Sequence, residues 1–319
     1  MQKRAFGATD MRISPIGFGS WAIGGANWAY GWGSQDDGAA IAAIQKAVEL
    51  GVNWIDTAAV YGLGHSEKLV AKAVAGMKHK PYIFTKCSLV WNEHHQISNS
   101  LRPDSIRREC EQSLKRLKVD AIDLYQIHWP NPEADIEVGW LEMARLKEEG
   151  LVRHIGVSNF TVNQLQRVMA IAPVASIQPP YSMLRPAAEL ELLPFCLEHE
   201  IGVIVYSPML SGMLTGAMTR ERAANFSSDD WRSQNKEFQE PRLSANLELV
   251  ELLKHIGSPH KRSAGEVAIA WTLRNPAVSG AIVGGRNAAQ VEGIMGAGEF
   301  RLSQQEIGII DHYIAGMPK

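Results

Sequence analysis

The stretch Gly51–Glu67, GVNWIDTAAVYGLGHSE, contains one copy of the unit from which we expect the whole fold to be built. Its apolar run Asn53–Asp56 is typical of a strand, ends on a carboxylate, and is followed by a loop of small residues. From Ser66 to Ala75 the apolar residues recur at helical spacing. The stretch therefore predicts one strand, one loop and one helix.

The same alternation continues in both directions along the chain. The expected strands are Ile16–Gly19, Asn53–Asp56, Tyr82–Lys86, Ile122–His128, His154–Ser158, Ser176–Gln178, Gly202–Ser207 and Gly280–Val283. The expected helices are Asp37–Leu50, Ser66–Ala75, Pro103–Leu117, Ile136–Glu149, Val162–Ala170, Ala187–Glu200 and Ser263–Arg274. Strands separated by helices, with mostly short connections, favour a closed parallel barrel over an open doubly wound sheet.

We therefore expect an α/β fold of the (β/α)8 TIM-barrel type, formed by residues 1–319 as a single domain. A short hairpin is predicted around Phe6 to Ile13, before the first barrel strand. After the seventh strand comes a long polar insertion, Pro208–Lys261, which includes the helix-like stretch Leu243–His255. Insertions of this length usually carry function, and here we expect a lid.

The composition, 45% hydrophobic and 21% charged over 319 residues, is that of a globular protein able to bury a large core. A formal net charge of −2 gives no strong field, so neither nucleic acid nor a membrane is expected as a partner. The three cysteines lack metal-ligand spacing, and neither a signal-peptide core nor an 18-residue apolar run occurs. We expect a cytoplasmic protein without a metal site that binds a small molecule, and the pattern leaves monomer and homo-oligomer equally open.

Four side chains that could carry chemistry follow predicted strands: Asp56, Tyr61, Lys86 and His128. Because the carboxyl ends of parallel strands meet at one face of a barrel, we expect these side chains to lie together. Hydride transfer to a carbonyl carbon leaves negative charge on the oxygen, which an acid must neutralise. Tyr61 would be that acid, with its pKa lowered by Lys86. Asp56 would hold Lys86, and His128 would orient the substrate oxygen.

Taken one at a time, the same four residues have ordinary structural readings. Asp56 could cap a helix, Tyr61 could be a half-buried aromatic, Lys86 a surface charge and His128 a rim histidine. Their joint position at matched strand ends, inside the longer motifs quoted next, favours the catalytic interpretation over these structural ones.

The sequence resembles the aldo-keto reductases over nearly its whole length. The matching motifs are Gly51–Glu67, the triplet FTK ending at Lys86, LKRLKVDAIDLYQIHWP (Leu114–Pro130), IGVSNF (Ile155–Phe160) and YSPMLSGMLTG (Tyr206–Gly216). The resemblance implies a (β/α)8 barrel with a catalytic tetrad at the four positions named above. It is closest to bacterial members such as the inositol-catabolism and general-stress reductases, and more distant to the potassium-channel β subunits.

The same resemblance implies a nicotinamide cofactor. Ser158, Asn159 and Gln178 would bind the carboxamide, Tyr206 would stack on the nicotinamide, and Ser207, Leu210, Ser211 and Gly212 would receive the pyrophosphate. Gly284, Arg286 and Gln290 fall where the family holds the 2′-phosphate. Because a guanidinium matches phosphate geometry, Arg286 favours NADP(H) over NAD(H).

Two departures from the family pattern concern this cofactor. Gly293 and Ile294 replace an acidic residue and an asparagine that contact adenine, so we expect a weaker grip on the adenine ring. Ala217 and Met218 replace the usual Lys-Tyr after LTG, so pyrophosphate or lid contacts are expected to differ.

The natural substrate is not encoded in these motifs. Trp21 and Trp129, each placed after a predicted strand, are expected to contact a carbonyl substrate. Two other functions fit parts of the pattern. One is an NADP(H)-binding redox-sensing or regulatory subunit with little turnover, and the other is a metal-dependent barrel hydrolase using Asp56 and His128.

Overall fold

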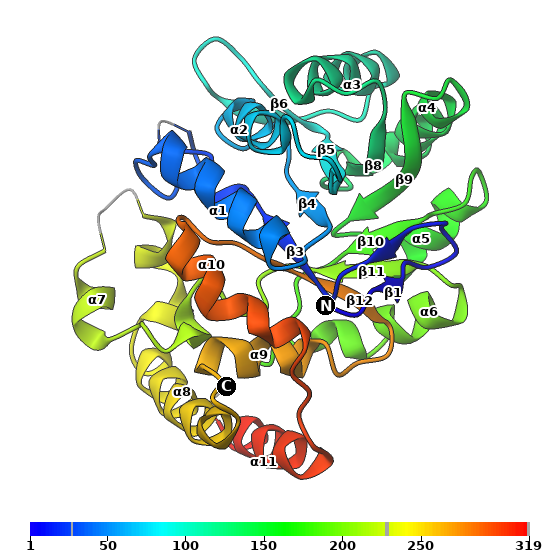
Figure 1. Ribbon diagram of the computed structural model, residues 1–319. Helices are drawn as coiled ribbons and strands as arrows, with labels where there is room; N and C mark the ends of the chain where they lie inside the picture. Colours follow the sequence, from blue (N-terminus) through cyan, green and yellow to red (C-terminus); the bar gives the residue numbers. More distant parts are fainter. Residues whose placement is uncertain (27, 227–229, 318–319) are drawn as a thin grey trace.

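The computed structural model describes residues 1–26, 28–226 and 230–317, so positions 227–229 of the predicted insertion lie outside it. Within these residues, parallel strands close into the predicted TIM barrel (Figure 1). The barrel strands are β3 (Ile16–Gly19), β4 (Trp54–Asp56), β5 (Tyr82–Cys87), β8 (Ile122–Ile127), β9 (Val152–Ser158), β10 (Ser176–Gln178), β11 (Gly202–Val205) and β12 (Val278–Val283). Strand β12 closes the barrel by pairing Ala281 with Ile16 of β3.

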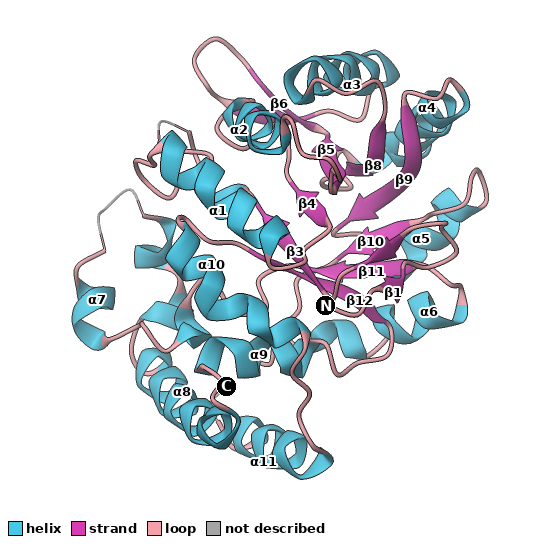
Figure 2. Cartoon of the chain, in the orientation of Figure 1, coloured by secondary structure: helices cyan, strands magenta, loops and turns pink. Residues whose placement is uncertain are grey.

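Helices form an outer layer around this barrel (Figure 2). They are α1 (Asp37–Glu49), α2 (His65–Val74), α3 (Pro103–Leu117), α4 (Ile136–Glu148), α5 (Val162–Met169), α6 (Leu192–Glu198), α9 (Ala264–Thr272), α10 (Ala288–Met295) and α11 (Gln304–Ala315). Local capping sets several boundaries. Thr161 and Ser263 each begin a helix with a capping box, which satisfies free backbone N–H groups of the first turn.

The predicted helix Ala187–Glu200 is wrong in its first half. A short 3₁₀ turn, Ala187–Glu189, comes first, and the helix itself spans only α6. Pro194 lies in the first turn of α6 and has no N–H to donate to the carbonyl of Leu190, so the helix cannot extend backwards through it. Helices α10 and α11, for which we had no prediction, follow the last strand.

The two ends of the barrel differ in how they are covered. A hairpin, β1 (Arg4–Ala5) with β2 (Arg12–Ile13), confirms the predicted N-terminal hairpin. It packs Phe6 and Ile13 into a core cluster with Trp54 and Phe84 from the barrel strands. The amino-terminal end of the barrel is thereby plugged, which leaves the carboxyl ends of the strands for a ligand site.

Two segments lie at the carboxyl ends of the strands. An unpredicted hairpin, β6 (Leu89–Trp91) with β7 (Ile97–Asn99), follows β5, and its Leu89 and Ile97 pack against the buried cluster of Trp28, Ala58 and Val60, on which Tyr61 also packs. The predicted insertion after the seventh strand is confirmed, and its elements are η4 (Met213–Thr215), α7 (Arg220–Ala224), η5 (Trp231–Gln234), η6 (Lys236–Phe238), α8 (Arg242–Gly257) and η7 (Ser258–His260). Among the described residues, none of the helices combines the length and the apolar character needed to cross a membrane.

Candidate active site

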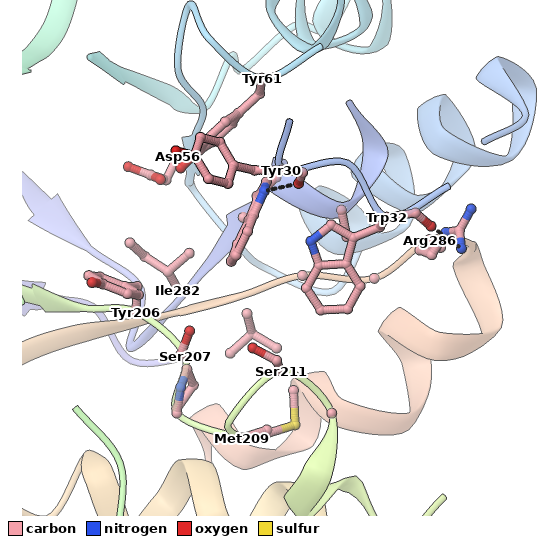
Figure 3. A pocket seen from close by; sticks show the side chains of 18 of the residues that line it. Tyr30, Trp32, Asp56, Tyr61, Tyr206, Ser207, Met209, Ser211, Ile282 and Arg286 are labelled. Carbon is pink, nitrogen blue, oxygen red and sulfur yellow. Dashed lines mark hydrogen bonds between the residues drawn. The ribbon is translucent and has the colours of Figure 1, made fainter. Parts of the chain in front are cut away.

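A cavity of about 820 Å³ opens at the carboxyl ends of the barrel strands. Figure 3 shows Asp56 and Tyr61 at one end of it and Arg286 at the other, with Tyr206, Ser207 and Ser211 along a third side. Most of the predicted site residues line it: Asp56, Tyr61, His128, Ser158, Asn159, Gln178, Tyr206, Ser207, Ser211, Gly212, Gly284, Arg286, Gln290, Trp21 and Trp129. The cavity thus gathers residues that are far apart in the sequence.

Two predicted residues do not line the cavity. Lys86 is fully buried and reaches the site only through Asp56 and the ring of Tyr61. Leu210, predicted to receive pyrophosphate, has a side chain that is only 2% exposed and belongs to the main hydrophobic core. Any contact from Leu210 to a ligand would have to come from its backbone.

Lys86 and Asp56 form a buried ion pair. The Lys86 Nζ donates to Asp56 Oδ1 at 2.6 Å and to the carbonyl of Thr57 at 2.9 Å. The other carboxylate oxygen accepts from Gln178 Nε2 at 2.8 Å and from Gln126 Nε2 at 3.5 Å. Burial lowers the pKa of Lys86, while Asp56 acts in the opposite direction. The predicted pairing of Lys86 with Asp56 is present, and its partners satisfy both charges.

Tyr61 and His128 lie beside this pair. Their ring centroids are 5.8 Å apart and nearly perpendicular, and Lys86 Nζ lies 5.2 Å from the centroid of the Tyr61 ring. Burial raises the pKa of Tyr61 well above its ordinary value, and Asp56 and Tyr206 add to that rise. The shift of this pKa is therefore upward, opposite to the expected lowering beside Lys86, and desolvation of the buried phenol is its largest cause. The phenol is protonated at neutral pH.

His128 is neutral in this site. Burial, followed by the charge of Lys86, lowers the pKa of the imidazole well below its ordinary value. A neutral imidazole offers one N–H donor and one acceptor, and its tautomer is set by its partners. His128 can thus hold a carbonyl oxygen by a hydrogen bond without adding charge.

Asn159 links three strand ends around the cavity. It adopts a left-handed backbone, φ 64°, which asparagine tolerates better than most residues. Its Nδ2 donates to the carbonyl of His128 at 3.0 Å, and its Oδ1 accepts from the Tyr206 hydroxyl at 2.9 Å. Ser158 Oγ donates to the carbonyl of Gln178 at 2.8 Å. These bonds hold the ends of β8, β9, β10 and β11 in one arrangement.

At the far end of the cavity, Arg286 is bound to the loop between β3 and α1. Its Nε donates to Gln35 Oε1 at 2.7 Å, Nη1 donates to the Trp32 carbonyl at 3.2 Å, and Nη2 donates to the Ser34 carbonyl. The backbone N–H of Arg286 donates to Gln290 Oε1 at 2.9 Å. Of its five side-chain N–H groups, two have no partner among the described residues.

The insertion reaches the same loop from the opposite side. The ring of Trp231 lies 5.9 Å from that of Trp21, and the Arg232 guanidinium lies 4.7 Å from the ring of Trp32. Arg232 is also paired with Asp230 at 2.6 Å. The loop and the insertion therefore meet over the cavity.

Sequence reasoning missed several cavity residues of the insertion, among them the arginines Arg222 and Arg232. Arg222 lines the cavity, and its Nη1 donates to the Ala217 carbonyl at 3.2 Å. Within the described ranges, no carboxylate lies within salt-bridge distance of Arg222. A polar insertion has no periodicity that would single out one arginine. In the sequence, the only hint of a change in this part of the cavity was Ala217, which stands where the family usually has a lysine.

The residues that line the cavity fit a dinucleotide. Its volume is within the range of large ligand sites, about 300–1,000 Å³. The indole N–H of Trp32 is buried at this cavity and has no partner in the described part of the chain. Together with the guanidinium of Arg222, which has no ion-pair partner among the described residues, it leaves donors for an anionic, hydrogen-bonding ligand. Across residues 1–26, 28–226 and 230–317 no three His, Cys, Asp or Glu side chains gather as metal ligands.

Comparison with known proteins places the chain among enzymes that reduce or oxidise carbonyl compounds and alcohols. Residues 15–315 match the Aldo/keto reductase family. The chain is 36% identical to "Aldo-keto reductase YhdN" of Bacillus subtilis over 92% of this chain and 88% of that protein. It is 32% identical to "NADH-specific methylglyoxal reductase" of Escherichia coli over 96% of each chain.

A solved structure, that of the glycerol dehydrogenase AKR11B4 from Gluconobacter oxydans, matches with a TM-score of 0.90 at 34% identity. That match covers 98% of this chain and 95% of the other. The family match and these near-full-length likenesses agree with the barrel and with the predicted resemblance. The chain belongs to the aldo/keto reductase family and is an oxidoreductase that acts on carbonyl compounds.

Proposed function

We propose that the protein is an NADP(H)-dependent reductase that converts uncharged aldehydes or ketones to alcohols, with Tyr61 as the general acid. The observation that carries this proposal is the meeting of Tyr61 and His128 at one cavity wall, with the Lys86–Asp56 pair directly behind Tyr61. The raised pKa keeps a proton on the Tyr61 hydroxyl at neutral pH. An acid that is protonated at rest is what reduction requires.

Each residue has one task in this proposal. A bound nicotinamide supplies the hydride. His128 donates a hydrogen bond to the substrate oxygen, and Tyr61 donates its proton as negative charge grows there. Lys86, 5.2 Å from the ring of Tyr61, stabilises the phenolate that results. Asp56 keeps the ammonium in place.

The cofactor would lie along the cavity from Tyr61 to Arg286. Ser158, Asn159 and Gln178 would bind the carboxamide, and Tyr206 would stack on the nicotinamide. Ser207, Leu210, Ser211 and Gly212 all have positive φ angles, 58°, 45°, 53° and 94°. Backbones with such residues form concavities of N–H groups that bind anions. Within this turn the N–H groups of Leu210 and Gly212 donate to the carbonyls of Ser207 and Met209, so among the described residues the Ser207 and Ser211 N–H groups are the ones without a partner. Arg222 would add the positive charge that the pyrophosphate requires.

NADP(H) is proposed over NAD(H) because of Arg286. The two N–H groups of its guanidinium that have no partner among the described residues can bind a 2′-phosphate while the others hold the loop. Gly293 and Ile294 line the cavity near this end and offer adenine no hydrogen-bonding side chain. More of the affinity must then come from the phosphate. Relatives differ in this respect, since the Escherichia coli protein is named as NADH-specific and a Schizosaccharomyces pombe relative carries NADP(+) in its name.

The substrate is proposed to be uncharged, with an apolar or aromatic group beside the carbonyl. Trp21 and Trp28 lie 6.5 Å and 6.0 Å from the ring of Tyr61, and Leu89 packs against the same cluster. Trp129 lines the cavity and is 43% exposed, so a substrate can reach it. The charges at this end, Lys86 and Asp56, neutralise each other.

The test is a cofactor-oxidation screen with NADPH and NADH against aromatic aldehydes, aliphatic aldehydes, dicarbonyls, sugars and a carboxylate-bearing aldehyde. We expect turnover of uncharged aldehydes with NADPH, and little with the carboxylate. If the protein binds NADPH tightly but turns over no carbonyl, the better assignment is a redox-sensing or regulatory subunit. Turnover confined to NADH would overturn the cofactor assignment.

A further inference from the structure

A buried carboxylate, Glu109, lies behind the candidate site on helix α3. Its side chain is 5% exposed. Its Oε2 accepts from the backbone N–H of Ser88 at 3.1 Å, and its Oε1 accepts from Ser105 Oγ at 3.2 Å. Ser88 follows Lys86 by two residues, at the point where β5 ends. Glu109 therefore contacts the segment that carries the ammonium of the site.

Ser88 joins that segment to the strand that carries His128. It is fully buried and has a φ of 81°, a backbone that residues other than glycine adopt only when their surroundings impose it. The Ser88 hydroxyl accepts from the Trp129 N–H at 3.2 Å and donates to the Trp129 carbonyl at 3.4 Å. One residue earlier, the His128 N–H donates to the Cys87 carbonyl at 3.0 Å.

A chain of hydrogen bonds thus runs from Glu109 through Ser88 to Trp129. Cys87 to Ser88 lies directly after Lys86, and Trp129 lies directly after His128. The unusual backbone of Ser88 sets the direction in which the chain leaves β5, and the Glu109 carboxylate holds that backbone by its N–H.

Stability alone does not account for a carboxylate at this position. Among the described residues Glu109 has no salt-bridge partner, and burial raises its pKa to about 7. Besides its partners Ser88 and Ser105, the groups that interact with it electrostatically are the Cys87 thiol from β5, the Tyr125 hydroxyl from β8, and Arg108 and Arg116 on its own helix. An unpaired buried carboxylate is unfavourable. Its presence indicates a requirement for an acceptor at Ser88.

We propose that Glu109 is a positioning residue of the reductase, which sets the relative placement of Lys86 and His128 through Ser88 and holds Trp129 at the cavity. The inference rests on the proposed function, since it assigns Glu109 to the same site. Glu109 itself does not line the ligand cavity, so it would act on the site through the backbone of Ser88.

The test compares Glu109→Leu, which removes the acceptor, with Glu109→Gln, whose amide oxygen can still accept from the Ser88 N–H. Glu142→Leu is the matched control: Glu142 is 3% exposed on α4, and its partners among the described residues are the arginines Arg107 and Arg145. The measurements are kcat and KM for a carbonyl found in the screen, the Kd of NADPH, and amide hydrogen exchange over residues 86–90 and 127–130.

For Glu109→Leu we expect kcat per NADPH-binding site to fall roughly tenfold to hundredfold, as misplacing catalytic groups typically does. The KM for the carbonyl should rise and the Kd of NADPH should stay unchanged. Amide hydrogen exchange at Ser88 and Trp129 should become faster. Glu109→Gln should restore most of kcat. Glu142→Leu should lose stability only. If Glu109→Leu does not fold, Ser88→Ala is tested in its place. This variant removes the two hydroxyl bonds with Trp129, and we expect KM for the carbonyl to rise.

Unchanged kinetic constants and unchanged exchange in Glu109→Leu would overturn the inference while leaving the proposed function intact, and so would equal kinetic losses in Glu142→Leu. A wild-type protein without carbonyl turnover would instead overturn the proposed function, and with it the kinetic role of Glu109. The exchange measurement needs no activity and separates the two failures.

Discussion

Arg286 and Gln35, which are 251 residues apart in the sequence, bind each other twice: Arg286 Nε donates to Gln35 Oε1 at 2.7 Å, and Gln35 Nε2 donates to the Arg286 carbonyl at 3.0 Å. This reciprocal pair fastens the loop between β3 and α1 to the loop after β12, across one end of the cavity. Arg286 can therefore act in two ways, as a clamp on the loop and as a ligand for a phosphate. The two actions predict different cofactor behaviour.

Replacing Arg286 and Gln35 separately distinguishes these actions. If Arg286 binds the 2′-phosphate, Arg286→Ala should weaken NADPH binding by roughly tenfold to hundredfold, the worth of a charge-assisted hydrogen bond, and barely change NADH. Gln35→Ala should loosen the loop and therefore weaken the binding of NADPH and NADH by a similar factor. Fluorescence titration with each cofactor measures this. Equal losses for NADH and NADPH in Arg286→Ala would show that the arginine acts only as a clamp.

Arg222 should contribute to binding of both cofactors, because the pyrophosphate is common to them. We expect Arg222→Ala to weaken NADPH and NADH by a similar factor, about tenfold, and to reduce the salt dependence of binding. Arg220 provides the control on the same short helix, since it is engaged by Glu240 and Ser244. An Arg220→Ala variant that loses as much affinity as Arg222→Ala would contradict the assignment.

Removing the phenolic hydroxyl should abolish reduction without affecting the cofactor. Tyr61→Phe keeps the ring that packs against Trp21 and Trp28 but has no proton to donate. General acid catalysis contributes about 10²–10⁴-fold, so turnover should fall by that factor while NADPH titrates as in the wild type. Near-normal turnover by Tyr61→Phe would remove Tyr61 as the acid.

Breaking the buried ion pair should cost both activity and stability. Lys86→Met leaves Asp56 as an uncompensated carboxylate, which is 2% exposed. Losing one partner of a buried pair typically lowers the free energy of unfolding by about 3–5 kcal/mol. Urea denaturation measures the loss. The double variant Asp56→Leu/Lys86→Met should regain much of the stability and none of the activity, and a Lys86→Met protein as stable as wild type would argue against the pairing.

The buried Glu109 should make stability depend on pH. Its folded pKa, about 7, lies above the ordinary value of 4.5, so the unfolded chain loses the proton first. The contribution of Glu109 to the free energy of unfolding should then fall as pH rises from 4.5 to about 7 and level off above it, by ~3 kcal/mol in all. Glu109→Gln should lack this component. Parallel pH profiles of unfolding free energy for the two proteins would show that Glu109 does not titrate in this range.

Local sequence patterns were enough for the barrel. Ile16–Gly19, Ser176–Gln178 and Pro103–Leu117 were predicted with the bounds that the structure has, because apolar periodicity, proline and capping residues act over a few neighbouring residues. The gathering of Asp56, Tyr61 and His128 was also predictable, because the carboxyl ends of parallel strands meet at one face whatever the loops do.

What the pattern did not predict depends on contacts between distant segments. The tie between Gln35 and Arg286, the packing of Trp231 on Trp21 and the place of Arg222 at the cavity arise from loops whose paths are set by tertiary packing. The pKa of Tyr61 was expected to fall beside Lys86, and it rises because the phenol is desolvated in the assembled site and because Asp56 lies near it. Residue types and local spacing determined the fold and the chemical groups of the site. Burial and long-range contacts, which exist only once the barrel has closed, decided the charges of those groups and which of them are free to bind a ligand.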